Sequence, residues 1–199
     1  MAIAPITPAL IQTGPGRIRF APVGTAIPTI TPTASKYTAI SWALWGDVGS
    51  TDSGLTYTEA TETSDIRVAE SKYPVRTVTT SKSSRVAFTA QEVSDLIWQL
   101  AMNGGTLTAS GTAGTKQTEY APPLADSERR VMLSFQSNAD DEIIVWPLVF
   151  QVGSVEFARG DFETKAGLPM EFNAELPQGI SGFVTPYKRW TTGALSLGV

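Results

Sequence analysis

The side chains that could do chemistry in this sequence are carboxylates and hydroxyls, because its 199 residues include no histidine and no cysteine. Histidine is the commonest general base and metal ligand, and thiolates are the usual ligands of structural zinc. A Ser-His-Asp triad and a disulfide framework are therefore excluded. The remaining candidate patterns are weak, and each has a plainer explanation.

Two of these patterns lie in polar stretches that resemble ligand loops. Gly111 to Lys116 contains glycines and a lysine, but the lysine does not follow a glycine and the spacing differs from that of a phosphate-binding loop. Asp140, Asp141 and Glu142 could contact calcium, but the spacing and the glycine of an EF-hand are missing. The sequence predicts a surface loop for the first and a turn between strands for the second.

A third pattern is the carboxylate pair of Glu171 and Glu175, which would suit glycoside hydrolysis if the two groups lay close together. Both fall on one face of a predicted strand, with Cα atoms roughly 13 Å apart at the standard rise per residue. Retaining glycosidases need a much shorter separation. The pair is better explained as a solvated or interface surface. We expect no enzyme, no cofactor and no metal.

The composition sets wider limits on function. Charged residues make up 17% of the chain, the net charge is −4, and the estimated pI is about 4.9. An acidic surface repels phosphate backbones, which argues against tight nucleic-acid binding. No apolar run is long enough to span a bilayer, and the proline-containing N-terminus lacks the basic region of a secretory signal. We expect a protein that folds in a cytoplasm without binding a membrane.

The elements that must position any site are mostly β. Three short β-type runs lie within Ser64 to Phe88, and the sequence then predicts a helix over residues 90–102. Thr89 and Glu92 match a capping box. An apolar stripe at helical spacing and the glycines at 104 and 105 support the helix and its end; the stripe consists of Val93, Leu96, Ile97, Leu100 and Ala101.

The second half of the chain predicts antiparallel strands. Residues 131–136 and 142–150 flank an Asn-Ala-Asp-Asp turn, with Pro147 marking a bulge or an edge. Residues 154–159 predict another short strand, and residues 183–190 predict a final strand or a docking tail. Leu168 to Leu176 alternates apolar and polar residues without exception, as a half-buried strand does. The whole predicts a mainly-β fold of about eight or more strands, in which antiparallel sheets form a sandwich or a small open barrel flanked by one α-helix.

Two regions depart from this pattern. Residues 1–35 hold many prolines and isoleucines and predict an extended arm with one short strand at Gly16 to Phe20, ahead of a domain at 36–199. The arm is either disordered or laid on a neighbour. Residues 46–63 are rich in Gly, Ser, Thr, Asp and Glu and predict a long loop or a projecting hairpin, and residues 106–126 predict a second surface loop.

Four segments follow one another along the chain: GRIRFAPVGTAIP (16–28), the Trp-Ala-Leu-Trp-Gly turn (42–46) leading into SGLTYTEATETSDI (53–66), SKYPVRTV (71–78) before the helix, and LPMEFNAEL (168–176). Taken in this order, they resemble segments of siphophage major tail proteins, the subunits of the phage tail tube. The resemblance covers nearly the whole chain. It implies a structural subunit that forms stacked six-membered rings, whose lumen conducts DNA during ejection.

The resemblance also implies partners and a place in the virion. Subunits of this family contact their own copies through a long loop and a terminal arm, and the tube meets tape measure, tail terminator and distal tail proteins. Assembly takes place in the host cytoplasm, and DNA passes through the lumen without specific binding. Six copies would bring about −24 charges to a ring, and a channel of one sign concentrates the electrostatic field.

Site residues follow as expectations. Acidic side chains on or beside the short strands are candidates for the lumen: Asp65, Glu70, Glu156, Asp161 and Glu163. Residues of the loop and of the strand after it are candidates for contacts between subunits or rings: Leu55, Tyr57, Glu59, Glu62, Arg76 and Arg85. Ion pairs of the two arginines with the two glutamates could fix register at an interface, although exposed pairs contribute little energy.

The alternative function is a β-sandwich binding module, such as an adhesin or a carbohydrate-binding domain without tube assembly. Five tryptophans could include a sugar platform: Trp42, Trp45, Trp98, Trp146 and Trp190. Trp98 and Trp146 fall within core patterns, which weakens this alternative.

Overall fold

The computed structural model describes residues 16–33, 36–38, 40–67, 69, 71–112, 115, 117–157 and 167–192. Nearly all of its regular structure is β, and every strand pairing is antiparallel, so the predicted mainly-β fold is confirmed. The elements are β1 (Gly16–Pro22), β2 (Gly46–Asp47), β3 (Thr51–Ile66), β4 (Arg76–Ala90), α1 (Asp95–Ala101), β5 (Thr106–Ser110), β6 (Gln117–Ala121), β7 (Val131–Ser137), β8 (Glu142–Gln151), β9 (Leu168–Ala174) and β10 (Lys188–Thr191).

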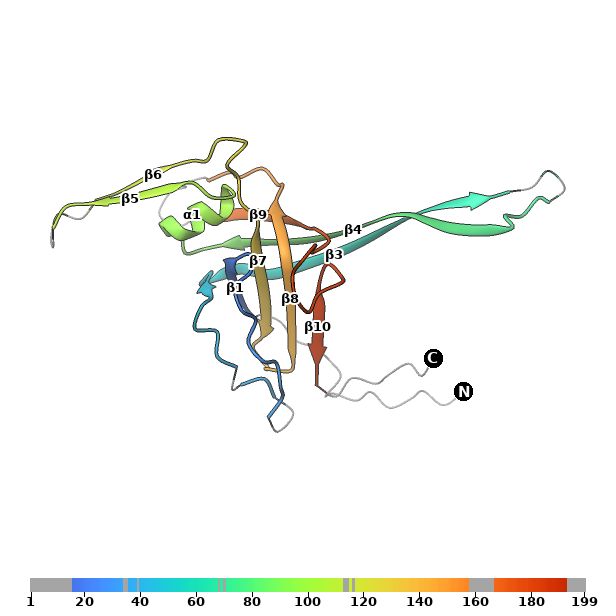
Figure 1. Ribbon diagram of the computed structural model, residues 1–199, viewed down its shortest axis with the longest axis horizontal. Coiled ribbons are helices and arrows are strands. Elements are labelled where there is room, and N and C mark those ends of the chain that lie inside the picture. Colours follow the sequence, from blue (N-terminus) through green and yellow to red (C-terminus); the bar gives the residue numbers. More distant parts are fainter. Residues whose placement is uncertain are drawn as a thin grey trace.

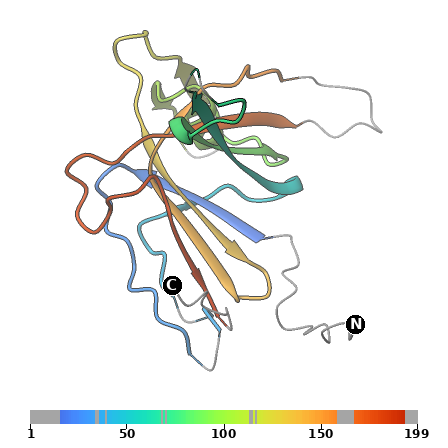
Figure 2. The ribbon, with the colours of Figure 1, turned by 90° about the vertical axis from the view of Figure 1, so that its right-hand side faces the viewer.

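One sheet runs through the molecule in the order β2-β1-β7-β8-β9-β4-β3, with β10 pairing with β8. It folds back on itself, because β1, β7, β8 and β10 run steeply across β9, β4 and β3 (Figures 1 and 2). The bend lies in β8, whose first residues pair with β10 and whose last residues pair with β9. Within β8, Pro147 lies between the residues that pair with β10 and those that pair with β9. The register between β7 and β8 shifts at this point, so the predicted bulge is confirmed.

The β1-β7-β8 part of the sheet is buried on both faces. Leu133 and Trp146 point into a core closed by β4, β9 and α1, whereas Met132 and Val145 point to the opposite face. A second cluster covers that face, with Trp42 packed edge-on against Trp45 at a centroid distance of 5.1 Å. This double burial makes β7 and β8 the most buried of the described strands.

The described part of the predicted arm belongs to this architecture. β1 lies between β2 and β7, and Ile27 and Ile30 pack against the second cluster. The indole N–H of Trp45 donates to the carbonyl of Ala26 over 3.2 Å. These apolar side chains therefore rest on their own chain.

The helix begins later than predicted. α1 starts at Asp95, and Ser94 is its N-cap, with Oγ accepting from the Ile97 N–H over 3.4 Å. Thr89 instead lies in β4, opposite Pro169, and the Glu92 carboxylate accepts from the Ser50 N–H and hydroxyl at 3.0 and 2.8 Å. The prediction of a capping box at Thr89 and Glu92 was wrong, because the pairing of β4 with β9 extends to Ala90 and prevents an earlier helix start. The predicted glycine stop is confirmed, since residues 103–105 all have positive φ.

Of the two alternatives predicted for residues 46–63, the long loop is wrong and the projecting hairpin is closer to the structure. Residues 51–63 belong to β3, which pairs with β4 from Leu55 opposite Phe88 out to Ile66 opposite Arg76. Residues 76–90 accordingly form one strand in place of two short runs. The resulting hairpin projects far beyond the sheet (Figure 1). Threonine and tyrosine have high β propensity, and here they form a strand without the alternating apolar face that marks a strand in the sequence.

Three shorter segments differ in how well they match the predicted elements. Residues 106–110 and 117–121 pair as the strands β5 and β6, where a loop was predicted. Residues 154–157 are not a strand, and 158–159 lie outside the described residues. The alternating segment from Leu168 is confirmed as β9, with Leu168, Met170 and Phe172 buried.

Candidate assembly surfaces

The outer half of the β3–β4 hairpin, residues 58–66 and 76–83, is the most exposed regular structure of the chain. All of these side chains are exposed except Val78, which is half-buried. β3 is the last strand of the sheet, so the hydrogen-bonding edge that faces away from β4 has no partner strand among the described residues. A long unpaired edge of this kind invites pairing with another chain.

Hydroxyl groups hold the carboxylates along this outer half. Thr77 donates to Asp65 and Ser81 donates to Glu62, both over 2.8 Å. At the inner end, the hydroxyls of Tyr57 and Tyr187 donate to Glu59 over 3.1 and 3.2 Å. These contacts fix the side chains of Glu59 and Glu62 without neutralising their charge, which leaves them available to a cationic partner.

The two arginines expected at an interface have different surroundings. Arg85 forms an ion pair with Glu171 of β9, with 2.6 Å between Nη1 and Oε1. Arg76 is exposed and lies opposite Ile66 at the outer end of the hairpin. Within one chain, the structure brings neither arginine to Glu59 or Glu62, since Arg85 faces Thr58 in the register of β3 and β4.

Leu55 and Tyr57, the other expected interface residues, lie at the inner end of the hairpin. Both pack against the main core, and the Tyr57 ring lies 5.8 Å from Trp146 and 5.2 Å from Tyr187. Burial raises the pKa of the Tyr57 hydroxyl, and its hydrogen bond to the Glu59 carboxylate raises it further. These two residues therefore anchor the hairpin to the domain.

Sequence reasoning missed the apolar tip of the hairpin. Ile66, Tyr73 and Val75 are 49%, 81% and 63% exposed, and they lie within ten residues of one another around Pro74. Exposed apolar side chains gathered at one site mark interaction surfaces more often than isolated ones do. The signal in the sequence was the tyrosine and valine on either side of a turn proline.

A second apolar surface lies near α1, away from the hairpin tip. Leu44 is 70% exposed and Leu96 is 54% exposed. With Phe20 and Val131 they line a groove of about 350 Å³ between α1 and the paired strands β1 and β7. Leu96 was expected in the core on the apolar stripe of the helix, and this expectation was wrong, whereas Ile97, Leu100 and Ala101 of the same stripe are buried as expected.

The acidic residues expected at a lumen are only partly described. Asp65 lies on the outer hairpin, and Glu156 precedes Phe157, which packs on Trp98 of α1 at 5.5 Å. Asp65 therefore lies on the projecting hairpin, whereas Glu156 lies in the part of the chain next to α1. Glu70, Asp161 and Glu163 lie outside the described residues.

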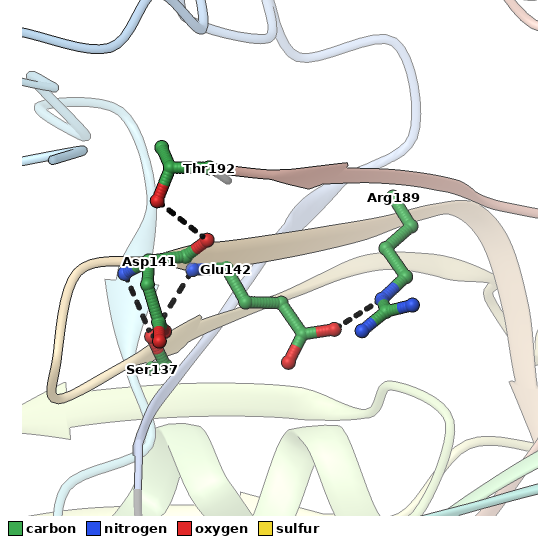
Figure 3. Close-up of polar contacts among 5 residues, drawn as sticks. All are labelled: Ser137, Asp141, Glu142, Arg189 and Thr192. Carbon is green, nitrogen blue, oxygen red and sulfur yellow. Dashed lines mark hydrogen bonds and ion pairs between the residues drawn. The ribbon is translucent and has the colours of Figure 1, made fainter. Parts of the chain in front are cut away.

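The carboxylates that could suggest chemistry have structural partners. Asp141 accepts from the Ser137 hydroxyl over 2.5 Å, and Glu142 pairs with Arg189 of β10, so the predicted turn between β7 and β8 is confirmed (Figure 3). Glu171 pairs with Arg85, and Glu175 forms a two-point contact with Arg130 at 2.5 and 3.2 Å. Among the described residues, no group of three or more carboxylates is placed to hold a metal ion.

The tryptophans do not form an open platform. Trp42, Trp45 and Trp146 are buried at 9% exposure or less, and Trp98 and Trp190 are half-buried. Sugar-binding surfaces need aromatic faces open to solvent. No helix within the described residues is long and apolar enough to cross a bilayer.

An antiparallel β domain with an unpaired edge hairpin, an apolar tip and paired carboxylates has the features of a structural subunit that associates with other chains. The sequence matches the family of phage tail tube proteins over residues 5–176, and the chain belongs to that family. It is therefore a structural component of a virion that self-assembles into a tube with other tail proteins. No curated protein matches the sequence.

Proposed function

We propose that this chain is the major tail protein of a siphophage, and that it stacks as six-membered rings around a lumen that conducts DNA during ejection. The observation that carries the proposal is the β3–β4 hairpin, which leaves the domain with its edge unpaired and its tip apolar. Contacts between different surfaces of identical subunits build rings when they close and filaments when they do not.

The two apolar surfaces suit such contacts because they differ and lie apart. The tip projects at one end of the longest axis, whereas α1, beside which the groove lies, belongs to the body of the domain (Figure 1). A tip on one copy and a groove on the next would bury Tyr73 and Val75 against Leu44 and Leu96. The charged residues Glu59, Glu62, Arg76 and Arg85 would set the register of neighbouring copies.

The lumen is the second part of the proposal. With a net charge of −4 per copy, a ring of subunits would present an acidic wall that repels the DNA backbone and lets it slide. The side chains proposed for this wall are Asp65, Glu70, Glu156, Asp161 and Glu163. Tape measure, terminator and distal tail proteins are the proposed partners at the inside and the ends of the tube.

Electron microscopy of the purified protein at rising concentration tests assembly directly. We expect rings or tubes with six-fold symmetry for the natural sequence, and only dispersed particles when Tyr73 and Val75 are both changed to serine. Val184→Ser is the matched control, because Val184 is 84% exposed on another loop. Dispersed monomers of the natural sequence at all concentrations would contradict the proposal, as would tubes formed equally well by the double variant.

A further inference from the structure

Arg19 is a buried cation in a polar pocket. It is 7% exposed, and it shares one face of β1 with Arg17, two residues earlier in the strand. Both arginines line a pocket of about 310 Å³ beside the β7–β8 turn. Among the described residues, no carboxylate lies within ion-pair distance of Arg19. A buried guanidinium normally has a carboxylate or phosphate partner, because desolvation of its charge is costly.

Gln136 holds the Arg19 side chain in place. Its Oε1 accepts from Arg19 Nη1 at 3.1 Å and from the Trp42 indole at 3.2 Å. Its Nε2 donates to the Tyr37 carbonyl at 3.0 Å and to Asp140 at 2.7 Å. Both amide N–H groups and the amide oxygen are thus engaged, so this side chain is fixed in one orientation.

The Trp42 ring fixes the guanidinium from a second side, with 5.1 Å between Arg19 Cζ and the ring centroid. The hydrogen bond to Gln136 uses only Nη1. The donors on Nε and Nη2 are left without a hydrogen-bond partner among the described residues. A guanidinium held in this way offers the fork geometry that matches a carboxylate in two parallel hydrogen bonds.

The charges around the pocket leave this fork available. Burial lowers the pKa of Arg19 most, and Asp47 and Asp140 act on it in the opposite direction through space. The carboxylate of Asp47 accepts from the Gly49 N–H at 2.9 Å, and that of Asp140 accepts from Gln136. Lys36 is turned to the carbonyl of Ala139. The nearby acids therefore reduce the excess positive charge without occupying the fork.

We propose that Arg19 and Arg17 form a carboxylate-binding pocket that receives an acidic side chain from a second copy of this chain. That the acidic side chain comes from a second copy rests on the proposed tube assembly, whereas the pocket itself rests on the contacts of Arg19 alone. A carboxylate on a single side chain fits better than a phosphate diester, because the diester carries two bulky substituents that a pocket of about 310 Å³ would have to admit. Arg17 is exposed at the mouth and would attract the incoming group.

The pocket is tested on the isolated full-length protein by NMR, at a concentration where light scattering detects no assembly. Sodium glutarate is titrated against sodium chloride at equal ionic strength. We expect saturable shifts of the Arg19 Nε–H and Trp42 indole signals with glutarate only. Arg17→Gln should weaken binding about tenfold, since a charge-assisted contact is lost. Arg67→Gln, the same exchange on the exposed hairpin, should leave binding unchanged.

Arg19→Lys keeps the charge but removes the fork, and it should abolish the saturable shifts if it folds. Should it not fold, Arg17→Gln decides the matter, because Arg17 is exposed. Equal shifts with glutarate and chloride, or no effect of Arg17→Gln on binding, would overturn the pocket.

Whether a second copy of the chain supplies the carboxylate is tested by assembly of the same variants. Arg17→Gln should raise the concentration needed for tubes about tenfold, and Arg67→Gln should raise it less. If glutarate binds and Arg17→Gln assembles like the natural sequence, the second copy is excluded as the source of the carboxylate. If the natural sequence forms no tubes at all, the proposed function fails, and the titration still decides the pocket.

Discussion

The two halves of β4 share one strand but have opposite surroundings. The inner half, residues 84–90, alternates buried and more exposed side chains and pairs with both β3 and β9. The outer half, residues 76–83, pairs with β3 alone and is exposed along nearly its whole length. The inner half is held by burial of apolar area, whereas the outer half has only cross-strand pairs and exposed hydrogen bonds to hold it.

This contrast explains how one strand can serve two purposes. A two-stranded hairpin without a hydrophobic face is marginally stable in water, so the outer half depends on the rigid inner half to project it. A surface kept out of the core can be covered in an assembly without unfolding the domain. The comparison predicts that substitutions in the inner half lower the stability of the fold and that substitutions in the outer half impair assembly.

The largest effect is expected from Phe172→Ala in β9. Phe172 is fully buried and stacks on Phe88 of the inner half at 5.7 Å. Loss of the ring should lower the free energy of unfolding by about 3–5 kcal/mol, measured by urea denaturation. Thr61→Ala in the outer half should change it by less than about 0.5 kcal/mol. Equal losses for the two variants would remove the distinction between the halves.

The next effect concerns assembly. Arg76→Glu in the outer half should raise the protein concentration required for tubes by about tenfold or more, because reversed charge at an interface opposes its register. The midpoint of urea denaturation should stay unchanged, since Arg76 is exposed. Arg76→Gln should have a smaller effect in the same direction. Normal tubes from the charge-reversed protein would rule out a role for Arg76 in assembly.

The sequence predicted the inner, buried elements well and the outer ones poorly, for a physical reason. β9 was found because burial of one face imposes strict alternation on Leu168, Met170 and Phe172. For β3, a loop and a projecting hairpin could not be told apart, because no core selects its residues and its threonines and glutamates look like those of a loop. Hydrophobic pattern detects strands that are buried in the monomer, and it carries no signal from an interface.

Local signals failed where tertiary pairing competed with them. The segment from Thr89 to Glu92 has the composition of a capping box, but strand pairing extends to Ala90. The Arg19 pocket could not be found at all, since it depends on Gln136, more than a hundred residues away in the sequence. Contacts of this range follow from sheet order, which the sequence alone did not provide.

A smaller effect tests where the inner half ends and the helix begins. Ser94→Ala should lower the free energy of unfolding by about 1 kcal/mol, because the Ile97 N–H loses its cap. Ser94→Asp keeps a capping oxygen and should stay within about 0.5 kcal/mol of the natural protein. Urea denaturation measures both. If Ser94→Ala were as stable as the natural protein, Ser94 would not cap the helix in solution.

The smallest effect lies at the border between the halves, where Tyr57 faces Val86. Burial raises the pKa of Tyr57, so its hydroxyl stays protonated in the folded protein at a pH where the unfolded chain ionises. This contribution to stability is complete below pH about 10 and is lost as the pH rises through the folded pKa. Tyr57→Phe should therefore reduce the fall in stability above pH 10, measured by urea denaturation across pH.

Burial also raises the pKa of Tyr37 and Tyr120, so part of the fall should persist. Exchange of the exposed Tyr73 for phenylalanine is the control, and identical pH profiles for Tyr57→Phe and the natural protein would place Tyr57 in the solvated outer half.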